Sequence, residues 1–289
     1  VEDGTYEAED FGQNFITLSV GVSLYGGYTA GSSFATRNAS ARLTLIQNSA
    51  PTVCGASAIP LTPCKTILVP GTVTNNTFID GFRITGASTS SDSTAISIVG
   101  GKPIISNNTI SGGSSNNAAG IIINNFGGSS AGDASQGAIV NNTISGGSCT
   151  VANCITAGLV SYSTTAGLFP YVQINTITGG SCATATCKTY GFYLGTGNSV
   201  DLNNFRYNTI SGGTVSPAST GTESTGIYIN DGSTTGKLYG NTINGGTAAN
   251  TSGIYLGVSM PLVIGDSATK TGNAIFGGTS NSTSYGVRL

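Results

Sequence analysis

A six-residue motif recurs through most of the chain at a nearly constant spacing. It reads Asn-Thr-Ile, then a small polar residue, then Gly-Gly, and successive copies begin 34, 33, 33, 33 and 32 residues apart. A repeat of this length is typical of solenoid proteins, in which each unit packs only on its neighbours. The copies begin at Asn108, Asn142, Asn175, Asn208, Asn241 and, in the altered form Asn-Ala-Ile-Phe-Gly-Gly, at Asn273.

Each unit holds three short apolar segments separated by Gly, Ser, Thr and Asn. One lies in the motif, a second begins with glycine, as in GFYL from Gly191 and GIYL from Gly253, and a third precedes the motif. None has helical periodicity, and Gly-Gly in every unit excludes a helical solenoid. Stacked units would bury a continuous core, with paired strands about 4.8 Å apart. We therefore predict an all-β fold, a single-stranded right-handed parallel β-helix with three short strands per coil and coils of ~33 residues.

The N-terminal part lacks the asparagine motif but also reads as strand sequence, as in residues 15–28 and 41–46. FRITGA from Phe82 fits the motif position after a shorter coil of 26 residues. We expect one structural domain, in which residues 1–81 are the N-terminal cap and first coils and residues 82–289 are the repeat coils. A cap is expected because a solenoid end otherwise exposes an unpaired edge.

The motif asparagines alternate in step with the motif isoleucines, so both should point into the core. A buried amide is costly unless it is hydrogen-bonded, and stacked amides can donate to the carbonyl of the next coil. We therefore predict a structural asparagine ladder rather than a ligand site. Its members are Asn108, Asn142, Asn175, Asn208, Asn241 and Asn273.

The composition excludes several classes of function. The chain of 289 residues has no histidine, which removes Ser/His/Asp and Cys/His catalysis and histidine-ligated metals. Ten Lys and Arg are too few for a nucleic-acid surface. No apolar run reaches the ~18 residues of a membrane span. Because the only methionine is Met260, we interpret the chain from Val1 as a mature or trimmed fragment whose export signal, if any, was removed.

Four sequence features together resemble a known family. They are the opening Val1–Tyr6, the turn Gly21–Tyr28, the segment Asp80–Gly86 and the Asn-x-Ile-x-Gly-Gly repeats. They resemble the right-handed β-helix repeat proteins of the pectin-lyase-like superfamily, which are secreted or displayed on the bacterial surface. The resemblance implies a secreted protein or one at the bacterial cell surface or outer membrane. It does not select a function, because the superfamily includes polysaccharide lyases, glycoside hydrolases, esterases, adhesins and phage tailspikes.

The six cysteines are an even number in a chain that looks exported, which predicts disulfides. Two cysteines follow one motif asparagine at offsets of seven and twelve, and two more have the same offsets one coil later, so the four should meet in stacked turns. We prefer pairing within each turn, Cys54–Cys64, Cys149–Cys154 and Cys182–Cys187. Pairing between coils, 149–182 and 154–187, is an alternative. A zinc site of those four cysteines is another, although their spacing is longer than in most zinc knuckles.

An aromatic row suggests a binding surface. The position two residues after the second-strand glycine should point outward, and it holds Tyr193, Tyr228 and Tyr255, with Ile122 and Val160 at the same position in earlier coils. Exposed rings beside hydrogen-bonding groups suit a sugar chain, although aromatic stacking also stabilises a sheet without any ligand. We therefore predict a non-catalytic, adhesin-like monomer that binds a polysaccharide or a host or cell-surface component and needs no cofactor.

A polysaccharide lyase or glycoside hydrolase acting on acidic polysaccharide is the alternative. The connections after the second strand carry Asp201, Asp231 and Asp266, and Arg206 and Lys237 precede the next motif. A lyase would need a base and Ca²⁺, which is expected only under this alternative. Against catalysis, the outer face of the motif strands carries no carboxylate, whereas the enzymes of the superfamily keep theirs on that face.

A third hypothesis concerns the threonines of the motif. They should form an outward grid with spacings of about 4.8 Å between coils, which is similar to the ice-binding face of β-solenoid antifreeze proteins. The second column of this grid lies two residues after each motif threonine, and serine or asparagine replaces threonine there in most copies. Threonine also suits an exposed strand without any ligand. Ice binding is therefore a remote alternative, and we expect Thr143, Thr176 and Thr209 each to tolerate valine.

Overall fold

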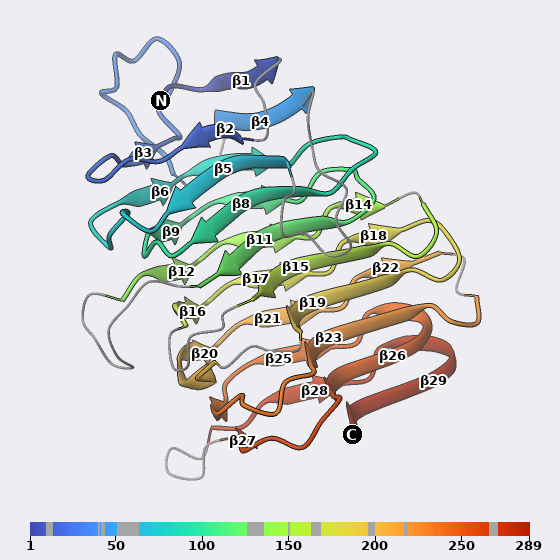
Figure 1. Cartoon of the computed structure of the whole chain (residues 1–289). Coiled ribbons are helices and arrows are strands. Elements are labelled where there is room, and N and C mark those ends of the chain that lie inside the picture. Colours follow the sequence, from blue (N-terminus) through green and yellow to red (C-terminus); the bar gives the residue numbers. More distant parts are fainter. Residues whose placement is uncertain are drawn as a thin grey trace.

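The computed structural model describes residues 1–9, 14–39, 41, 44–50, 64–125, 136–149, 151–162, 169–195, 200–216, 219–265 and 271–289. Within these residues the fold is all-β, and the one helix is the 3₁₀ turn η1 (Leu202–Asn204). Figure 1 shows parallel strands stacked from the N-terminal end at the top to the C-terminal end at the bottom. This arrangement is consistent with a parallel β-helix, so the predicted all-β class is confirmed. In the described part of the chain no helix is long and apolar enough to cross a membrane.

The motif strands form a nine-stranded sheet whose members pair in register one repeat apart. Ile144, for example, lies between Ile110 and Ile177 in the neighbouring strands, and all three isoleucines are buried. The threonine and the small polar residue on either side face outward, as strand alternation requires. In sheet order the strands are β1 (Gly4–Glu9), β4 (Thr44–Ala50), β7 (Phe82–Thr85), β10 (Thr109–Ser111), β13 (Thr143–Ser145), β17 (Thr176–Thr178), β21 (Thr209–Ser211), β25 (Thr242–Asn244) and β28 (Ala274–Phe276).

A second, twelve-stranded sheet carries the glycine-started segments. Its long strands are β2 (Asn14–Thr17), β5 (Cys64–Pro70), β8 (Ser93–Val99), β11 (Ala118–Asn124), β15 (Ile155–Ser161), β19 (Lys188–Leu194), β23 (Glu223–Ile229), β26 (Thr247–Leu256) and β29 (Thr279–Arg288). Three short strands continue it beyond β26, namely β14 (Ser148–Cys149), β18 (Ser181–Cys182) and β22 (Thr214–Val215).

The third sheet has six strands and precedes the motif strands along the chain. Its apolar centres, such as Ile105, Val172 and Phe205, are fully buried. Its strands are β3 (Leu24–Tyr25), β6 (Phe78–Asp80), β9 (Ile104–Ser106), β12 (Ala138–Val140), β16 (Tyr171–Gln173) and β20 (Phe205–Arg206), and a separate pair is formed by β24 (Gly236–Leu238) and β27 (Leu262–Ile264). One continuous apolar core lies between the sheets, from Leu18 to Ile254.

The motif asparagines form a hydrogen-bonded stack through this core. The side-chain oxygen of Asn175 accepts from the backbone N–H of Asn142 at 2.9 Å and from its side-chain amide at 3.1 Å. The side-chain amide of Asn175 in turn donates to the backbone carbonyl of Ile139 at 2.8 Å. The same pattern links Asn208 to Asn175 and Asn241 to Asn208. Each buried amide is therefore satisfied, as a polar group in a core must be.

The two glycines of the motif have different roles, which Gly179 and Gly180 illustrate. A Cβ atom on Gly179 would lie 1.8 Å from the carbonyl oxygen of Gly212 in the next repeat, so only glycine permits this close stacking. Gly180 has a φ of +86°, a left-handed conformation that favours glycine. Close approach and turn geometry together explain why the motif ends in Gly-Gly.

Residues 1–81 supply strands β1–β6, which pair into the same three sheets as the repeats. Arg37 joins separate parts of this region. Its guanidinium forms an ion pair with Asp80 and lies over the rings of Tyr25 and Tyr28, 5.3 and 5.7 Å from their centroids. Burial raises the pKa of Asp80, but hydrogen bonds from Ser106, Arg37 and Asn107 outweigh it and hold that pKa below its ordinary value. The carboxylate of Asp80 is thus kept ionised for its ion pair.

Candidate functional site

Three tyrosines and one arginine form a column on the outer face of the twelve-stranded sheet. Tyr193 of β19 pairs with Tyr228 of β23, Tyr228 with Tyr255 of β26, and Tyr255 with Arg288 of β29. We call these four residues the tyrosine column. The register follows from the repeat, because each member lies two residues after the glycine of its strand.

Glycine and a buried neighbour set the direction of the column. A Cβ atom on Gly191 would lie 2.5 Å from the Cγ2 atom of Ile210, so this position faces the core and only glycine fits it. Phe192, which follows, is completely buried. The strand pairing skips Gly191, so the regular alternation of side chains is interrupted there and resumes at Phe192. From the buried Phe192, alternation makes Tyr193 point outward, where it is half-buried.

The rings of the column stack face to face. The centroids of Tyr193 and Tyr228 are 5.2 Å apart with an interplanar angle of 5°, and those of Tyr228 and Tyr255 are 4.9 Å apart at 7°. The guanidinium of Arg288 lies 5.1 Å from the centroid of Tyr255. Both faces of Tyr228 are therefore covered by tyrosine, and the column offers ring edges and hydroxyl groups to a ligand rather than the open faces expected from the sequence.

The hydroxyl groups of Tyr193 and Tyr228 remain protonated at neutral pH. Burial, together with the neighbouring phenols, raises the pKa of Tyr228 to about 12. Burial also raises the pKa of Tyr193 above its ordinary value, and it raises that of the fully buried Tyr190 beneath them much further. A neutral phenol both donates and accepts hydrogen bonds, which suits recognition of sugar hydroxyls.

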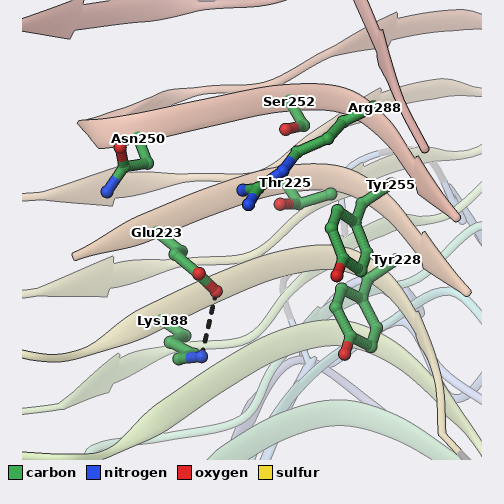
Figure 2. A pocket seen from close by; sticks show the side chains of 8 residues that line it. All are labelled: Lys188, Glu223, Thr225, Tyr228, Asn250, Ser252, Tyr255 and Arg288. Carbon is green, nitrogen blue, oxygen red and sulfur yellow. Dashed lines mark ion pairs between the residues drawn. The ribbon is translucent and has the colours of Figure 1, made fainter. Parts of the chain in front are cut away.

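A polar cavity of about 100 Å³ opens beside the column, across β19, β23, β26 and β29. Figure 2 shows parallel rings of Tyr228 and Tyr255 with their hydroxyls on the same side, and the side chains of Lys188, Glu223 and Arg288 to one side of the rings. Lys188 and Glu223 form an ion pair at 3.0 Å. The residues that line the cavity are Lys188, Glu223, Thr225, Tyr228, Asn250, Ser252, Tyr255 and Arg288.

The charged residues of this cavity were not predicted from the sequence. Lys188, Glu223 and Asn250 all lie three residues before the glycine of their strand, and Arg288 occupies the tyrosine position of the last repeat. This constant offset was a signal in the sequence, because the register of the repeats brings the first three side by side. The offset could therefore have identified the column of polar residues.

The tyrosine position is covered in the earlier repeats. Ile122 and Val160 are 2% and 3% exposed and pack with Ala119, Ala157 and Tyr190 in an apolar cluster. Within the predicted row, only the three tyrosines are thus partly exposed.

Where the structure describes them, the acids proposed for catalysis accept hydrogen bonds from the residue two positions later in the chain. Asp201 accepts hydrogen bonds from the backbone and the side chain of Asn203 at 3.0 and 3.1 Å, and so caps η1. Asp231 is buried, and its carboxylate accepts from the backbone of Ser233 at 3.4 Å. Asp266 lies outside the described residues.

The two basic candidates also have local partners. Arg206 hydrogen-bonds to the hydroxyl of Tyr239 and lies over the rings of Tyr207 and Tyr239. The backbone N–H of Lys237 donates to the side chain of Asn203 at 3.0 Å. Arg206 lies in β20 and Lys237 in β24, and neither of them lines the cavity beside the tyrosine column.

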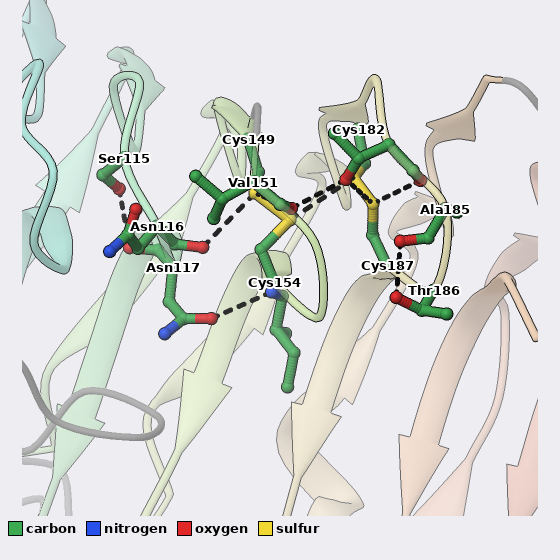
Figure 3. The surroundings of a disulfide bond; sticks show 12 residues. Ser115, Asn116, Asn117, Cys149, Val151, Cys154, Cys182, Ala185, Thr186 and Cys187 are labelled. Carbon is green, nitrogen blue, oxygen red and sulfur yellow. Dashed lines mark hydrogen bonds between the residues drawn. A yellow bond between two sulfur atoms is a disulfide. The ribbon is translucent and has the colours of Figure 1, made fainter.

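Four of the cysteines are paired within turns, as preferred from the sequence. Disulfides join Cys149 to Cys154 and Cys182 to Cys187, in the adjacent turns that Figure 3 shows. Cys64 is also disulfide-bonded, and Cys54 lies outside the described residues.

The motif threonines form the expected register on the nine-stranded sheet. Thr143, Thr176 and Thr209 are exposed and lie side by side on adjacent strands. The second column has a role within the turn, because the side-chain oxygens of Ser145 and Asn244 accept from backbone N–H groups two residues later at 3.1 and 2.7 Å. Turn formation thus explains why this column accepts serine or asparagine in place of threonine.

Comparison of the chain with protein families, with curated proteins and with solved structures gives no match.

Proposed function

We propose that the chain is a right-handed parallel β-helix with three strands per coil, of the pectin-lyase-like type, and that it binds a glycan without cleaving it. The alternation of strands among three sheets and the one-repeat register of each sheet support this architecture. Under this proposal the protein is secreted or displayed on a bacterial cell surface or outer membrane. Its ligand is a polysaccharide or a host or cell-surface glycan.

The observation that carries the binding function is the polar cavity beside the tyrosine column. Its volume of about 100 Å³ is smaller than that of enclosed small-molecule sites, which occupy about 300–1,000 Å³. A small open cavity next to a row of hydroxyls suits a polymer that lies across several strands and inserts one group. The stacked rings supply a rigid support, and the hydroxyls of Tyr228 and Tyr255 supply hydrogen bonds.

The number of carboxylates in the cavity favours binding over hydrolysis. Glycoside hydrolases generally use two carboxyl groups that flank the bond to be cleaved. Among the described residues that line the cavity, Glu223 is the one carboxylate, and it is held by Lys188. The cavity therefore has groups that recognise a sugar but not the pair that hydrolysis needs.

A glycan array tests the proposal with wild type and two triple variants. Replacing Tyr193, Tyr228 and Tyr255 by phenylalanine removes the hydroxyls and keeps the stacking, whereas replacing all three by alanine removes both. We expect the wild type to bind at least one class of glycan and both triple variants to lose that binding. A Thr143→Val variant, changed on the nine-stranded sheet, is the matched control and should bind normally. Equal binding by the wild type and the phenylalanine variant would contradict a site at the tyrosine column.

A further inference from the structure

Two disulfides lie next to each other in a buried part of the molecule. Cys149 and Cys182 pair in register in β14 and β18, and each is joined to the cysteine five residues later. The Sγ atom of Cys154 lies only 3.3 Å from that of Cys182, across the gap between the two bridges (Figure 3). All four cysteines are at most 3% exposed.

Three of the four sulfurs are grouped closely enough to share one metal ion. The Sγ atoms of Cys149, Cys154 and Cys182 lie within 4.8 Å of one another, and the sulfur of Cys187 is bonded to that of Cys182. A zinc ion with Zn–S bonds of about 2.3 Å separates its sulfur ligands by about 3.8 Å. The spacing Cys-x4-Cys also lies at the long end of the range that structural zinc sites use. Rotation of the cysteine side chains would therefore bring four sulfurs to one ion.

We propose that Cys149, Cys154, Cys182 and Cys187 bind one thiophilic divalent metal ion, such as Zn²⁺, when both disulfides are reduced. Each disulfide takes two electrons and two protons from a dithiol reductant, which is itself oxidised to a disulfide, and becomes two thiols. Zn²⁺ then replaces the thiol protons, which pass to solvent, and four Zn–S bonds form. The ion would join the two turns in place of the two separate bridges.

The surroundings favour metal-bound sulfur over free thiolate. The carbonyl oxygens of Asn116 and Thr184 lie 3.3 and 2.8 Å from the sulfurs of Cys149 and Cys187, and a carbonyl oxygen repels a negative charge. Four thiolates in this buried place would be costly without a cation. A divalent ion offsets that cost.

The next repeat indicates a variant that removes half of the site and keeps the fold. Val215 pairs with Cys182 in register, and Thr222 precedes Glu223 as Cys187 precedes Lys188 in the preceding repeat. Val215 and Thr222 are both buried, so the same environment accepts valine and threonine. The double variant Cys182→Val/Cys187→Thr should therefore fold and retain only two of the four sulfurs.

Zinc titration of the full chain, oxidised and reduced, tests the proposal. We expect the reduced wild type to bind one Zn²⁺ per chain and, with Co²⁺ as a probe, to show the absorption of a tetrahedral thiolate site. The oxidised wild type should bind none. We expect the double variant to bind Zn²⁺ at least 100-fold more weakly, and a Cys64→Ala variant, which removes the separate bridge, to match the wild type.

Circular dichroism of the same samples separates metal binding from loss of fold. If reduction unfolds the chain, Zn²⁺ should restore the β signal in the wild type and not in the double variant. The proposal is overturned if the reduced wild type neither binds one equivalent nor refolds with Zn²⁺. It is equally overturned if the double variant binds as tightly as the wild type.

Discussion

The residue before a ladder asparagine turns the chain toward the nine-stranded sheet. It has a positive φ in five successive repeats, +56° at Asn107, +55° at Asn141, +58° at Ile174, +58° at Tyr207 and +69° at Gly240. Asparagine and glycine tolerate this left-handed conformation, whereas a β-branched residue is disfavoured there. Ile174 is the one β-branched residue of the series, and it is also 59% exposed, so it contributes little to the core.

Replacing Ile174 by asparagine should stabilise the protein. The change introduces asparagine, which occupies this position at Asn107 and Asn141 in two other repeats. It relieves a backbone strain that we expect to be worth about 1 kcal/mol. Chemical denaturation of wild type and Ile174→Asn measures the difference in the free energy of unfolding. Asn141→Ile is the reverse control and should destabilise by a similar amount. Loss of stability in Ile174→Asn would show that packing of the isoleucine outweighs the backbone strain.

At the scale of the element, the register between strands of neighbouring repeats determines which side chains lie side by side. The threonines of β13, β17 and β21 lie side by side on an exposed face. The tyrosines of β19, β23 and β26 lie side by side on another sheet and stack into a column. The first arrangement needs only a side chain that suits an exposed strand, whereas burial in the second raises the pKa of Tyr228.

Valine at Thr143, Thr176 or Thr209 should leave the fold intact. Valine has the same branched shape and a similar preference for strands, so we expect a change in unfolding free energy within about 0.5 kcal/mol for each variant. Thermal denaturation followed by circular dichroism measures it. The same samples should show no thermal hysteresis in the presence of ice. A hysteresis gap in the wild type that a Thr176→Tyr variant abolishes would instead support ice binding.

The tyrosine column should make stability depend on alkaline pH. The ordinary pKa of a tyrosine is 10.0 and that of Tyr228 in the fold is about 12, so between these values the phenol ionises in the unfolded chain first. The contribution of Tyr228 to stability is complete below pH 10 and is lost as the pH rises toward 12. We expect Tyr228→Phe to lose less unfolding free energy than the wild type between about pH 9 and about pH 11.5. An equal loss in both proteins would contradict the shifted pKa.

At the scale of the whole molecule, the repeat made the strands and their faces predictable. A constant spacing of motif asparagines fixes which residues pair, so the isoleucine core and the tyrosine alignment could be predicted from the sequence. The contacts that depend on side-chain geometry could not. Alternation places Ile122 outward but does not show that the apolar cluster around Tyr190 buries it. Spacing likewise aligned the tyrosines without showing that their ring faces would cover one another.

The proposed catalytic acids show the same limit in the connections between repeats. These connections differ in length, so sequence offsets do not place their side chains relative to one another. Asp201 is used to cap a short helical turn of its own connection, which the repeat pattern could not indicate. The cavity beside the tyrosine column depends instead on regular strand register, so its charged residues could have been predicted from the repeat.

Calorimetric titration with the glycan that binds best on the array tests the central claim most directly. Tyr228→Phe removes one hydroxyl from the middle of the column and keeps its ring between those of Tyr193 and Tyr255. If that hydroxyl bonds to the glycan, the dissociation constant should rise by about 3- to 10-fold, the equivalent of one neutral hydrogen bond. A dissociation constant unchanged from that of the wild type would show that the glycan does not contact the column at Tyr228.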